Sequence, residues 1–437
     1  MMTSDLSPPR EAYVWTWLPA AVQPVVAGRL VASDGEIGFV YGRSYRERAD
    51  AIPLYLPELP LGPGLIRPGP GLVIANAIRD AAPDAWGRRV ILNRIFGARR
   101  EEIDQTHLDE LTFLLASGSD RTGALDFQES ARDYIARGAA GTLDELIRSA
   151  ARVEANVPLT PELDAALHHG SSIGGARPKA QITAGDVKYV AKFSSGNDSY
   201  NVVKGEYVAM RLAAIAGLDV APVRLEHSEG RDVLLVERFD RLRTDGGWAR
   251  RAMVSGLTIL GLDEMEARYA SYQDLAEQVR MRFNAVPRTL RELFGRMVLN
   301  ILVGNVDDHA RNHAAFWDGR RLDLTPAYDI CPQGRAGEEA SQAMLIHGNV
   351  RASQLAACIA AAGHFHLTEN DAIALIEAQI RVIGENWRSV CEEARLGEID
   401  RRYFWGRQFL NPYAFYALPD AAASLSDFAG AYRTANA

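Results

Sequence analysis

The order of secondary-structure patterns between residues 171 and 243 restricts the fold of this chain more than any other feature of its sequence. ARPKAQITAGDVKYVAKFSS predicts a hairpin that turns at Gly185. NVVKGEYVAMRLAAIAG then predicts a helix that ends near Gly217. Two further strands follow, in APVRLEHSEG and DVLLVERFDR. This order predicts a small sheet with one helix packed against it.

The chain becomes helical after about Arg243, where strand patterns almost vanish. LRELFGRMVLNILVGN places its apolar residues at the spacing of a buried helix face. LTENDAIALIEAQIRVIGENWRSVCEEA predicts a long amphipathic helix with Thr368 as its N-cap. A short strand in RRLDLT is an exception. We therefore expect a helical lobe over residues 244–437.

The N-terminal part has a third kind of pattern. VVAGRLVAS and EIGFVYG alternate apolar and polar residues, which predicts strands, and DAWGRRVILNRIFG is helical in pattern. The proline-rich stretch from Pro53 to Pro70 predicts an ordered surface connection. At roughly 150 residues per domain, 437 residues predict two or three domains. The patterns place their boundaries at 1–130 for an N-terminal subdomain, 131–243 for a small lobe and 244–437 for a large lobe.

Composition excludes several classes of protein. A hydrophobic content of 47% is too high for a disordered chain. A net charge of −8 makes direct nucleic-acid binding unfavourable, because affinity for phosphates needs a basic face. The three cysteines form no C-x-x-C pair, which favours a reducing compartment. With neither a signal-peptide pattern nor an apolar stretch of about 18 residues, the sequence predicts a cytoplasmic protein without a membrane span.

A glycine-containing turn and a strand lysine form the first half of a candidate nucleotide site. In SSIGGARPKA, residues 171–180, two adjacent glycines let the backbone approach a ligand, and successive N–H groups can face phosphate oxygens. Lys192 lies on the next strand, and Glu206 on the following helix is placed to hold its charge. Taken singly, these features also fit a tight turn, an exposed lysine and a solvated glutamate.

The segment NVDDHARNH, residues 305–313, forms the second half. Asp307 and Asn312 have the D-x-x-x-x-N spacing of a kinase catalytic loop, in which a carboxylate takes the acceptor proton and an amide oxygen holds Mg²⁺. Asp329, in LTPAYDI, lies 22 residues after Asp307, in the region where a kinase has its principal metal ligand.

Two alternatives exist for this segment. Asp308 and His309 are residue types of a metal hydrolase, but no second His/Asp cluster with ligand spacing accompanies them in the sequence. A polar helix cap is the other alternative. The order of a Gly-rich turn, a lysine, a glutamate, D-x-x-x-x-N and an aspartate in one chain favours a kinase over both.

These motifs together resemble the HipA-type serine/threonine kinases, the toxin half of bacterial toxin–antitoxin pairs. The resemblance covers nearly the whole chain and rests on DAAPDAWGRRVI, SSIGGARPKA, YVAKF, VERFDR, NVDDHARNHAAF and LTPAYDI. It implies an α+β, two-lobed protein-kinase-like fold with a small mixed β lobe, a large all-helical lobe and an N-terminal β-rich subdomain. The loop departs from the G-x-G-x-x-G of ordinary protein kinases. AMVSGLTILGLDE also replaces an acidic, glutamine-containing stretch of several relatives.

The resemblance implies roles for individual residues, with ATP as phosphoryl donor and Mg²⁺ as metal. Asp307 would be the catalytic acid/base, and Asn312 and Asp329 would hold Mg²⁺. Ser172 matches the serine that family members autophosphorylate, and the adjacent Ser171 stays an alternative. The positions that match nucleotide-binding residues are Ile173, Gly174, Gly175, Ala176, Lys192, Glu206, Glu237, Phe239 and His309.

The family also implies partners. One is a helix-turn-helix antitoxin of the HipB type, through which DNA would be contacted only indirectly. The other is a protein substrate, an aminoacyl-tRNA synthetase and most often the glutamyl enzyme, although nothing in the sequence selects the target. Lys179 matches a basic position of the family loop, with a strand-edge lysine as an equal alternative. A small-molecule kinase and a catalytically silent corepressor module remain alternatives for the whole chain.

Overall fold

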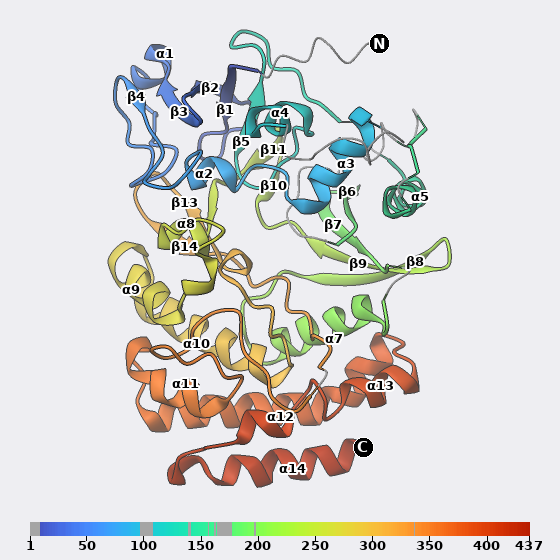
Figure 1. Cartoon of the computed structure of the whole chain (residues 1–437). Coiled ribbons are helices and arrows are strands. Elements are labelled where there is room, and N and C mark those ends of the chain that lie inside the picture. The colour runs from blue at the N-terminus through green and yellow to red at the C-terminus, as the bar shows by residue number, and fades with distance from the viewer. Residues whose placement is uncertain are drawn as a thin grey trace.

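The computed structural model describes residues 9–96, 108–138, 141–155, 157–160, 163, 177–195, 198–335 and 337–437. The N-terminal subdomain, the small-lobe sheet and the helical large lobe follow one another from top to bottom in Figure 1. The chain ends in the red helices α12 (Glu369–Glu393) and α14 (Ser424–Asn436), which lie side by side at the bottom of that view.

The N-terminal subdomain is built on a five-stranded antiparallel sheet in the order β4-β3-β2-β1-β5. The strands predicted from alternation are present as β2 and β3, and most of the proline-rich connection is irregular, as predicted. The strands are β1 (Glu11–Thr16), β2 (Val25–Ser33), β3 (Glu36–Tyr41), β4 (Leu65–Ile66) and β5 (Leu125–Gln128), and the short helices are α1 (Arg43–Arg46), α2 (Asn76–Arg79) and α4 (Glu110–Ala116).

The small lobe has the predicted order of strand, strand, helix, strand, strand. Its antiparallel sheet runs β6-β7-β9-β8, and the helix α7 lies between β7 and β8 in the chain. The elements are β6 (Lys179–Ala184), β7 (Val187–Phe193), α7 (Val202–Ile215), β8 (Val223–Ser228) and β9 (Arg231–Glu237). The hairpin turns at Gly185 and the helix stops before Gly217, both at positive φ as glycine allows.

One core of the small lobe is shared with helices that come from earlier in the chain. Trp86 of α3 (Ala85–Phe96) and Leu146 of α5 (Leu143–Glu154) pack with Phe193 of β7 and Val233 of β9 in a buried cluster. The helix α3, which the sequence placed in segment 1–130, therefore packs on the sheet of the small lobe.

The large lobe is mainly helical, as predicted, but "all-helical" is wrong in detail. A three-stranded sheet, β12-β13-β14, and the hairpin β10–β11 lie near its junction with the small lobe. The short strand predicted in RRLDLT is present as β14. The other strands have three or four residues, too few for a period-2 pattern to show, and β12 pairs with a strand far along the chain. These strands are β10 (Arg241–Thr244), β11 (Gly247–Arg250), β12 (Met253–Ser255), β13 (Ala314–Trp317) and β14 (Leu322–Leu324).

The buried helix α10 (Val286–Leu302) is the centre of the large lobe and leads directly into the candidate catalytic loop. Its predicted apolar face is buried, and Thr368 caps α12 with a reciprocal capping box, as expected. The other helices of this lobe are α8 (Gly256–Leu260), α9 (Tyr272–Arg282), α11 (Leu355–Ala361) and α13 (Glu398–Phe404).

Candidate active site

A glycine turn and the side chain of Asn305 shape the region where the segments around Asp307 and Asp329 meet. Gly304, with φ +71°, turns the chain after α10, and a Cβ there would lie 2.9 Å from the backbone of Gln408. Asn305 then donates a hydrogen bond to the Asn300 side chain at 3.0 Å and to the Asp329 carbonyl at 3.4 Å. The predicted catalytic loop and the second aspartate are therefore neighbours, although they are separate in sequence.

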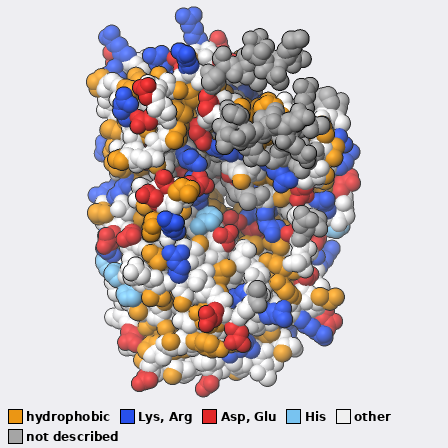
Figure 2. All heavy atoms as spheres, viewed as in Figure 1, with side chains coloured by type: hydrophobic (Ala, Val, Ile, Leu, Met, Phe, Trp, Pro, Cys, Tyr) orange, Lys and Arg blue, Asp and Glu red, His pale blue; other side chains and the backbone are white. Residues whose placement is uncertain are grey.

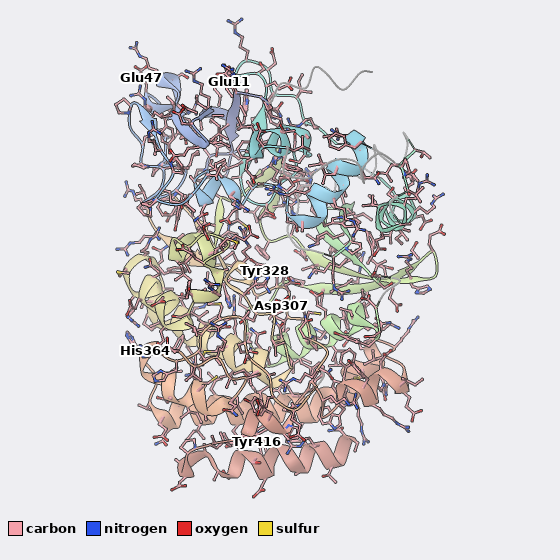
Figure 3. All side chains as sticks on the ribbon, in the orientation of Figure 1. Glu11, Glu47, Asp307, Tyr328, His364 and Tyr416 are labelled. Atoms are coloured by element: carbon pink, nitrogen blue, oxygen red, sulfur yellow. The ribbon has the colours of Figure 1, made fainter. Side chains whose placement is uncertain are left out.

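Asp307 is exposed, and its loop is held by bonds to its own backbone. The Asn312 side chain donates to the Asp307 carbonyl at 3.2 Å, and the His309 N–H donates to the same oxygen at 2.9 Å. In Figure 3, Asp307 and Tyr328 lie close together between the two lobes. On the face shown in Figure 2, acidic side chains and a histidine reach the surface at about this level.

The predicted lysine–glutamate pair is confirmed, and the lysine also reaches the second aspartate. Lys192 Nζ lies 2.5 Å from Glu206 Oε1 and 2.5 Å from Asp329 Oδ1. This contact joins β7, α7 and the large lobe. We call Lys192, Glu206 and Asp329 the nucleotide-site cluster.

Charge in this cluster is stabilised by its geometry. Burial disfavours the charged form of Lys192, but Asp329 and Glu206 outweigh it and raise the pKa of the lysine. Burial would likewise raise the pKa of Asp329, but Lys192, then Lys179, lower it to about 2. Partial burial raises the pKa of Asp307; the charge of His309 opposes this shift and that of Asp329 adds to it.

The backbone of Asp329 adopts the left-handed conformation, with φ +59°. Non-glycine residues rarely take this conformation, although aspartate tolerates it better than most, and such residues cluster at functional sites. Tyr328 anchors the same turn, because its hydroxyl donates to the Arg311 carbonyl at 2.7 Å. The conformation aims the Asp329 carboxylate at Lys192.

The oxygen donors suit Mg²⁺ bound together with a nucleotide. Asp329 supplies a carboxylate and Asn312 an amide, the hard ligands that Mg²⁺ prefers. No group of three His, Cys, Asp or Glu side chains in the described part of the chain could hold a metal ion by itself. In a kinase-type site one or two protein groups hold Mg²⁺, and phosphates and water supply the remaining ligands.

The metal-hydrolase alternative does not fit the side chain of Asp308. Asp308 is 2% exposed, lies 3.1 Å from His313 Nε2 and accepts a hydrogen bond from the Tyr272 hydroxyl. Burial would raise its pKa, but His313 lowers it below the ordinary value. Asp308 thus anchors the loop inside the protein, and Asp307 beside it faces outward.

The segment that joins the lobes leaves hydrogen-bonding groups for a base. The Glu237 N–H donates to the Pro222 carbonyl at 2.9 Å, whereas proline has no N–H to return a bond to the Glu237 carbonyl. The Phe239 ring lies 5.6 Å from that of Tyr328 and 5.8 Å from that of Phe316. We call residues 237–240 the hinge.

Several predicted residues cannot be compared with the structure. Ser171, Ser172, Ile173, Gly174, Gly175 and Ala176 lie outside the described residues. Lys179 is described: it is buried, and its Nζ lies 3.8 Å from Asp84 Oδ2. The sequence analysis missed Asp84, for which the only sequence signal is its place in the motif DAAPDAW.

The geometry defines a two-lobed protein-kinase-like fold, with a strand lysine, a helix glutamate and two aspartates meeting between the lobes. Within that class, the chain belongs to the HipA-like C-terminal domain family, which matches residues 171–389. No helix in the described ranges has the length and apolarity needed to cross a bilayer.

Known proteins extend the similarity. Y4mE of Sinorhizobium fredii is 33% identical over 177 residues, 36% of this chain and 41% of that protein. The serine/threonine-protein kinase toxin HipA of Shewanella oneidensis is 25% identical over 185 residues, 36% of this chain and 42% of that protein. The chain thus spans less than half the length of these curated relatives.

A solved structure supports the fold along 94% of the chain. It is the complex of the Shewanella oneidensis toxin–antitoxin proteins HipA and HipB with operator DNA, at a TM-score of 0.61 and 20% identity, covering 94% of both chains. The agreement includes the N-terminal subdomain, which lies outside residues 171–389.

Proposed function

We propose that this protein transfers the γ-phosphoryl group of ATP, bound with Mg²⁺, to a serine or threonine hydroxyl of a protein. The observation that carries the proposal is the contact of Lys192 with both Glu206 and Asp329, next to the exposed carboxylate of Asp307. Phosphoryl transfer needs such an arrangement, because catalysis depends on positioning and on stabilising charge around the phosphates.

Each residue has a defined task in this proposal. The Glu237 carbonyl would accept a bond from the amino group of adenine, and the Phe239 N–H would donate to the ring. Lys192 and His309 would bind phosphate oxygens. Asp329 and the amide oxygen of Asn312 would hold Mg²⁺, which neutralises phosphate charge when bound. Asp307 would orient the acceptor hydroxyl and take its proton.

The biological role follows from the family. We propose that the protein is a growth-arrest toxin of the bacterial cytoplasm, neutralised by a helix-turn-helix antitoxin that makes the main DNA contacts. The acidic balance of the chain supports this division of labour. An aminoacyl-tRNA synthetase, the glutamyl enzyme first, is the proposed substrate on the family resemblance alone.

We further propose self-inactivation through Ser172. A phosphoserine carries a charge of about −1.5 to −2 at neutral pH and would repel nucleotide phosphates from the Gly-rich loop. Ser171 is the alternative acceptor.

Intact-mass spectrometry after incubation with Mg-ATP tests both proposals. We expect one added phosphate in the wild type, mapped to Ser172, and none in Asp307→Asn, which keeps the shape of the side chain but cannot take the proton. Chelation of Mg²⁺ should also prevent the modification. Equal modification of both proteins would contradict the role of Asp307.

A negative result is resolved by a second measurement. If neither protein gains phosphate from a sample that starts unmodified, the binding of Mg-ATP is measured by calorimetry. Binding without transfer would indicate a kinase that needs its target protein. No binding would contradict the kinase proposal and favour the catalytically silent corepressor.

A further inference from the structure

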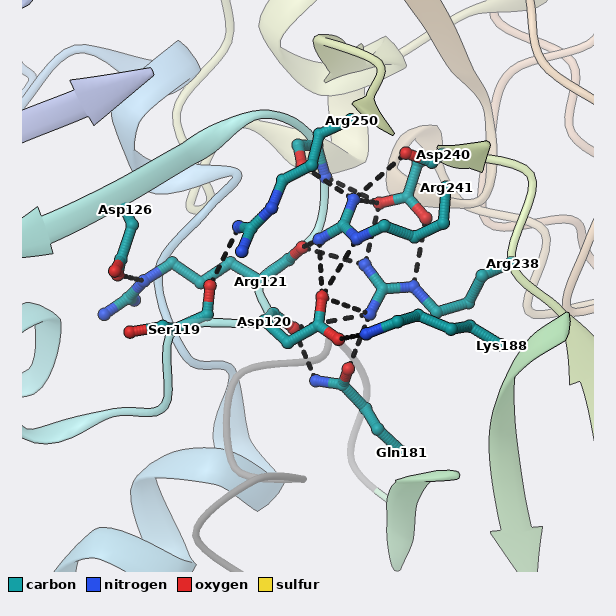
Figure 4. Close-up of polar contacts among 11 residues, drawn as sticks. Ser119, Asp120, Arg121, Asp126, Gln181, Lys188, Arg238, Asp240, Arg241 and Arg250 are labelled. Atoms are coloured by element: carbon teal, nitrogen blue, oxygen red, sulfur yellow. Dashed lines mark hydrogen bonds and ion pairs between the residues drawn. The ribbon is translucent and has the colours of Figure 1, made fainter. Parts of the chain in front are cut away.

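A buried charge network joins the N-terminal subdomain to the hinge (Figure 4). We call its members Asp120, Lys188, Arg238, Asp240 and Arg241 the junction network. Asp120 Oδ1 accepts from Arg238 Nη1 at 3.1 Å and from Arg241 Nε at 2.9 Å, and Lys188 donates to the other oxygen. The side chains are at most 6% exposed, apart from Lys188 at 16%.

Asp120 enters this network from the N-terminal subdomain, in the loop between α4 and β5. The backbone of the same loop is also bonded to the hinge. Arg238 Nη2 donates to the Arg121 carbonyl at 2.8 Å, and the Gly123 N–H donates to Asp240 Oδ2 at 2.8 Å. Bonds therefore run in both directions between the loop and the hinge, which makes this junction rigid.

The two sides of the hinge face different partners. Arg238 and Asp240 are buried against the N-terminal loop, while Glu237 and Phe239 alternate with them and are partly exposed. This is the period of an extended chain, in which successive side chains point to opposite sides. Phe239 packs beside Tyr328 of the large lobe. The bonds that hold Arg238 and Asp240 therefore also fix the backbone of Glu237 and Phe239.

We propose that Asp120 is a positioning residue for the nucleotide, which holds Arg238 from the N-terminal side and so fixes the hinge groups that bind adenine. The inference rests on the proposed kinase function. The described partners of the Asp120 side chain are Lys188, Arg238 and Arg241, none of them in the segments around Asp307 and Asp329. Its loss therefore weakens nucleotide binding more than the chemical step. The N-terminal subdomain is then part of the support of the nucleotide site.

The test compares Asp120→Asn with a matched control, Asp126→Asn. Asp126 is also buried in the N-terminal subdomain, but its ion-pair partners are the side chains of Arg121 and Arg137. The bonds of Arg121 to Arg238 and Arg241 are made by its carbonyl, which this substitution keeps. Affinity for Mg-ADP is measured by titration calorimetry on the full chain, together with kcat and KM for ATP. Circular dichroism first establishes a temperature at which each protein is folded.

We expect Asp120→Asn to bind Mg-ADP about tenfold more weakly with kcat changed by less than about threefold, and Asp126→Asn to bind like the wild type despite a lower Tm. Wild-type affinity in a folded Asp120→Asn protein would overturn this inference and leave the kinase proposal standing. A wild-type protein that binds no Mg-ADP would overturn both.

A second variant covers the case in which Asp120→Asn does not fold. Lys188 is the most exposed member of the junction network, so Lys188→Met loosens the hold on Asp120 without emptying a fully buried position. A reduction of Mg-ADP affinity of about two- to fivefold with unchanged kcat would support the inference. An unchanged affinity would overturn it.

Discussion

The nucleotide-site cluster and the junction network use the same residue types but differ in how completely their charges are paired. In the junction network, Asp120 and Asp240 each face at least two cations, and the side chains are almost wholly buried. In the nucleotide-site cluster, two carboxylates share Lys192, and Asp329 is 38% exposed.

This difference separates a cluster that supports the site from a cluster that can bind a ligand. In the junction network each carboxylate is already bonded to at least two cations and is shielded from water, so neither carboxylate is available to a metal ion. A cluster with an excess of carboxylates and an exposed member can take up Mg²⁺ and phosphates. The comparison predicts that changes in the junction network mainly alter stability and nucleotide affinity, whereas changes in the nucleotide-site cluster mainly alter the rate of phosphoryl transfer.

The strongest test of this comparison is Arg238→Met. The variant leaves Asp120 and Asp240 buried with fewer partners, and breaking such a network costs about 3–5 kcal/mol of unfolding free energy. Urea denaturation at neutral pH measures the loss. Arg243→Met is the control, because Arg243 is 47% exposed and pairs with an exposed aspartate, and it should cost less than about 1 kcal/mol. Equal losses in the two variants would contradict the structural role of the junction network.

The corresponding change in the nucleotide-site cluster is Lys192→Met. We expect phosphoryl transfer to fall by about 10²–10³, the usual result of removing one charged group that stabilises the transition state. The loss of stability should be smaller than in Arg238→Met, because water can reach Asp329. Single-turnover kinetics and urea denaturation measure the two effects.

Lys204→Met is the matched control for this variant. Lys204 lies in the first turn of α7 and, like Lys192, is paired with a carboxylate, that of Asp232 at 3.4 Å, but it is not part of the site. Its transfer rate should equal that of the wild type. If Lys192→Met kept its activity, or lost as much stability as Arg238→Met, the two clusters would not differ in the proposed way.

The contribution of the junction network to stability should also depend on pH. Burial opposes the charge of Asp240, but Arg238 and Arg241 hold its pKa at about 2, below the ordinary value of 3.8. A depressed pKa stabilises the fold above pH 4, and this stability is lost as the pH falls from 4 to 2, because the unfolded chain binds the proton first. The contribution is about 2 kcal/mol.

The measurement is the unfolding free energy of the wild type and Asp240→Asn at several pH values from 2 to 6. The difference between them should be constant above pH 5 and should shrink toward pH 2, where the wild-type carboxyl group becomes protonated in the folded protein as well. A difference that does not depend on pH would show that the charge of Asp240 contributes nothing.

The sequence predicted the elements of the small lobe and the nucleotide-site cluster because both leave local signals. The strands, α7 and α12 follow from periodicity and from end signals such as Gly217 and Thr368. Lys192, Glu206 and Asp329 were recognised because residue type and order repeat a known chemical pattern. The contact of Lys192 with Glu206 was confirmed, the contact of Lys192 with Asp329 is a finding of the structure, and the roles of all three stay predictions.

The junction network gave no such signal. Asp120 and Arg238 are separated by more than a hundred residues, and each alone resembles an ordinary surface charge. The short strands β12 and β13 were missed for the same reason, since pairing across a long separation decides them. Sequence patterns report local periodicity, and a buried ion pair between distant segments has none.

A final, smaller effect concerns Asp84, which extends the comparison to a residue outside both clusters. It directly precedes α3, and its Oδ2 lies 3.8 Å from Lys179 Nζ, beside the nucleotide-site cluster. Burial raises the pKa of Asp84 to about 6, against the pull of Lys179. Its charge is therefore present at pH 8 and largely absent at pH 5.

Asp84→Asn should raise the KM for ATP by no more than about fivefold at pH 8, the size expected for a single ion pair of up to about 1 kcal/mol. The ratio of variant to wild-type KM should return to one at pH 5, where both side chains are neutral. The helix cap does not confuse this test, because the oxygen that accepts from the Gly87 N–H at 3.0 Å is kept in asparagine. An equal ratio at both pH values would mean that Asp84 acts on the site by packing and not by charge, and would assign it to the structural side of the comparison.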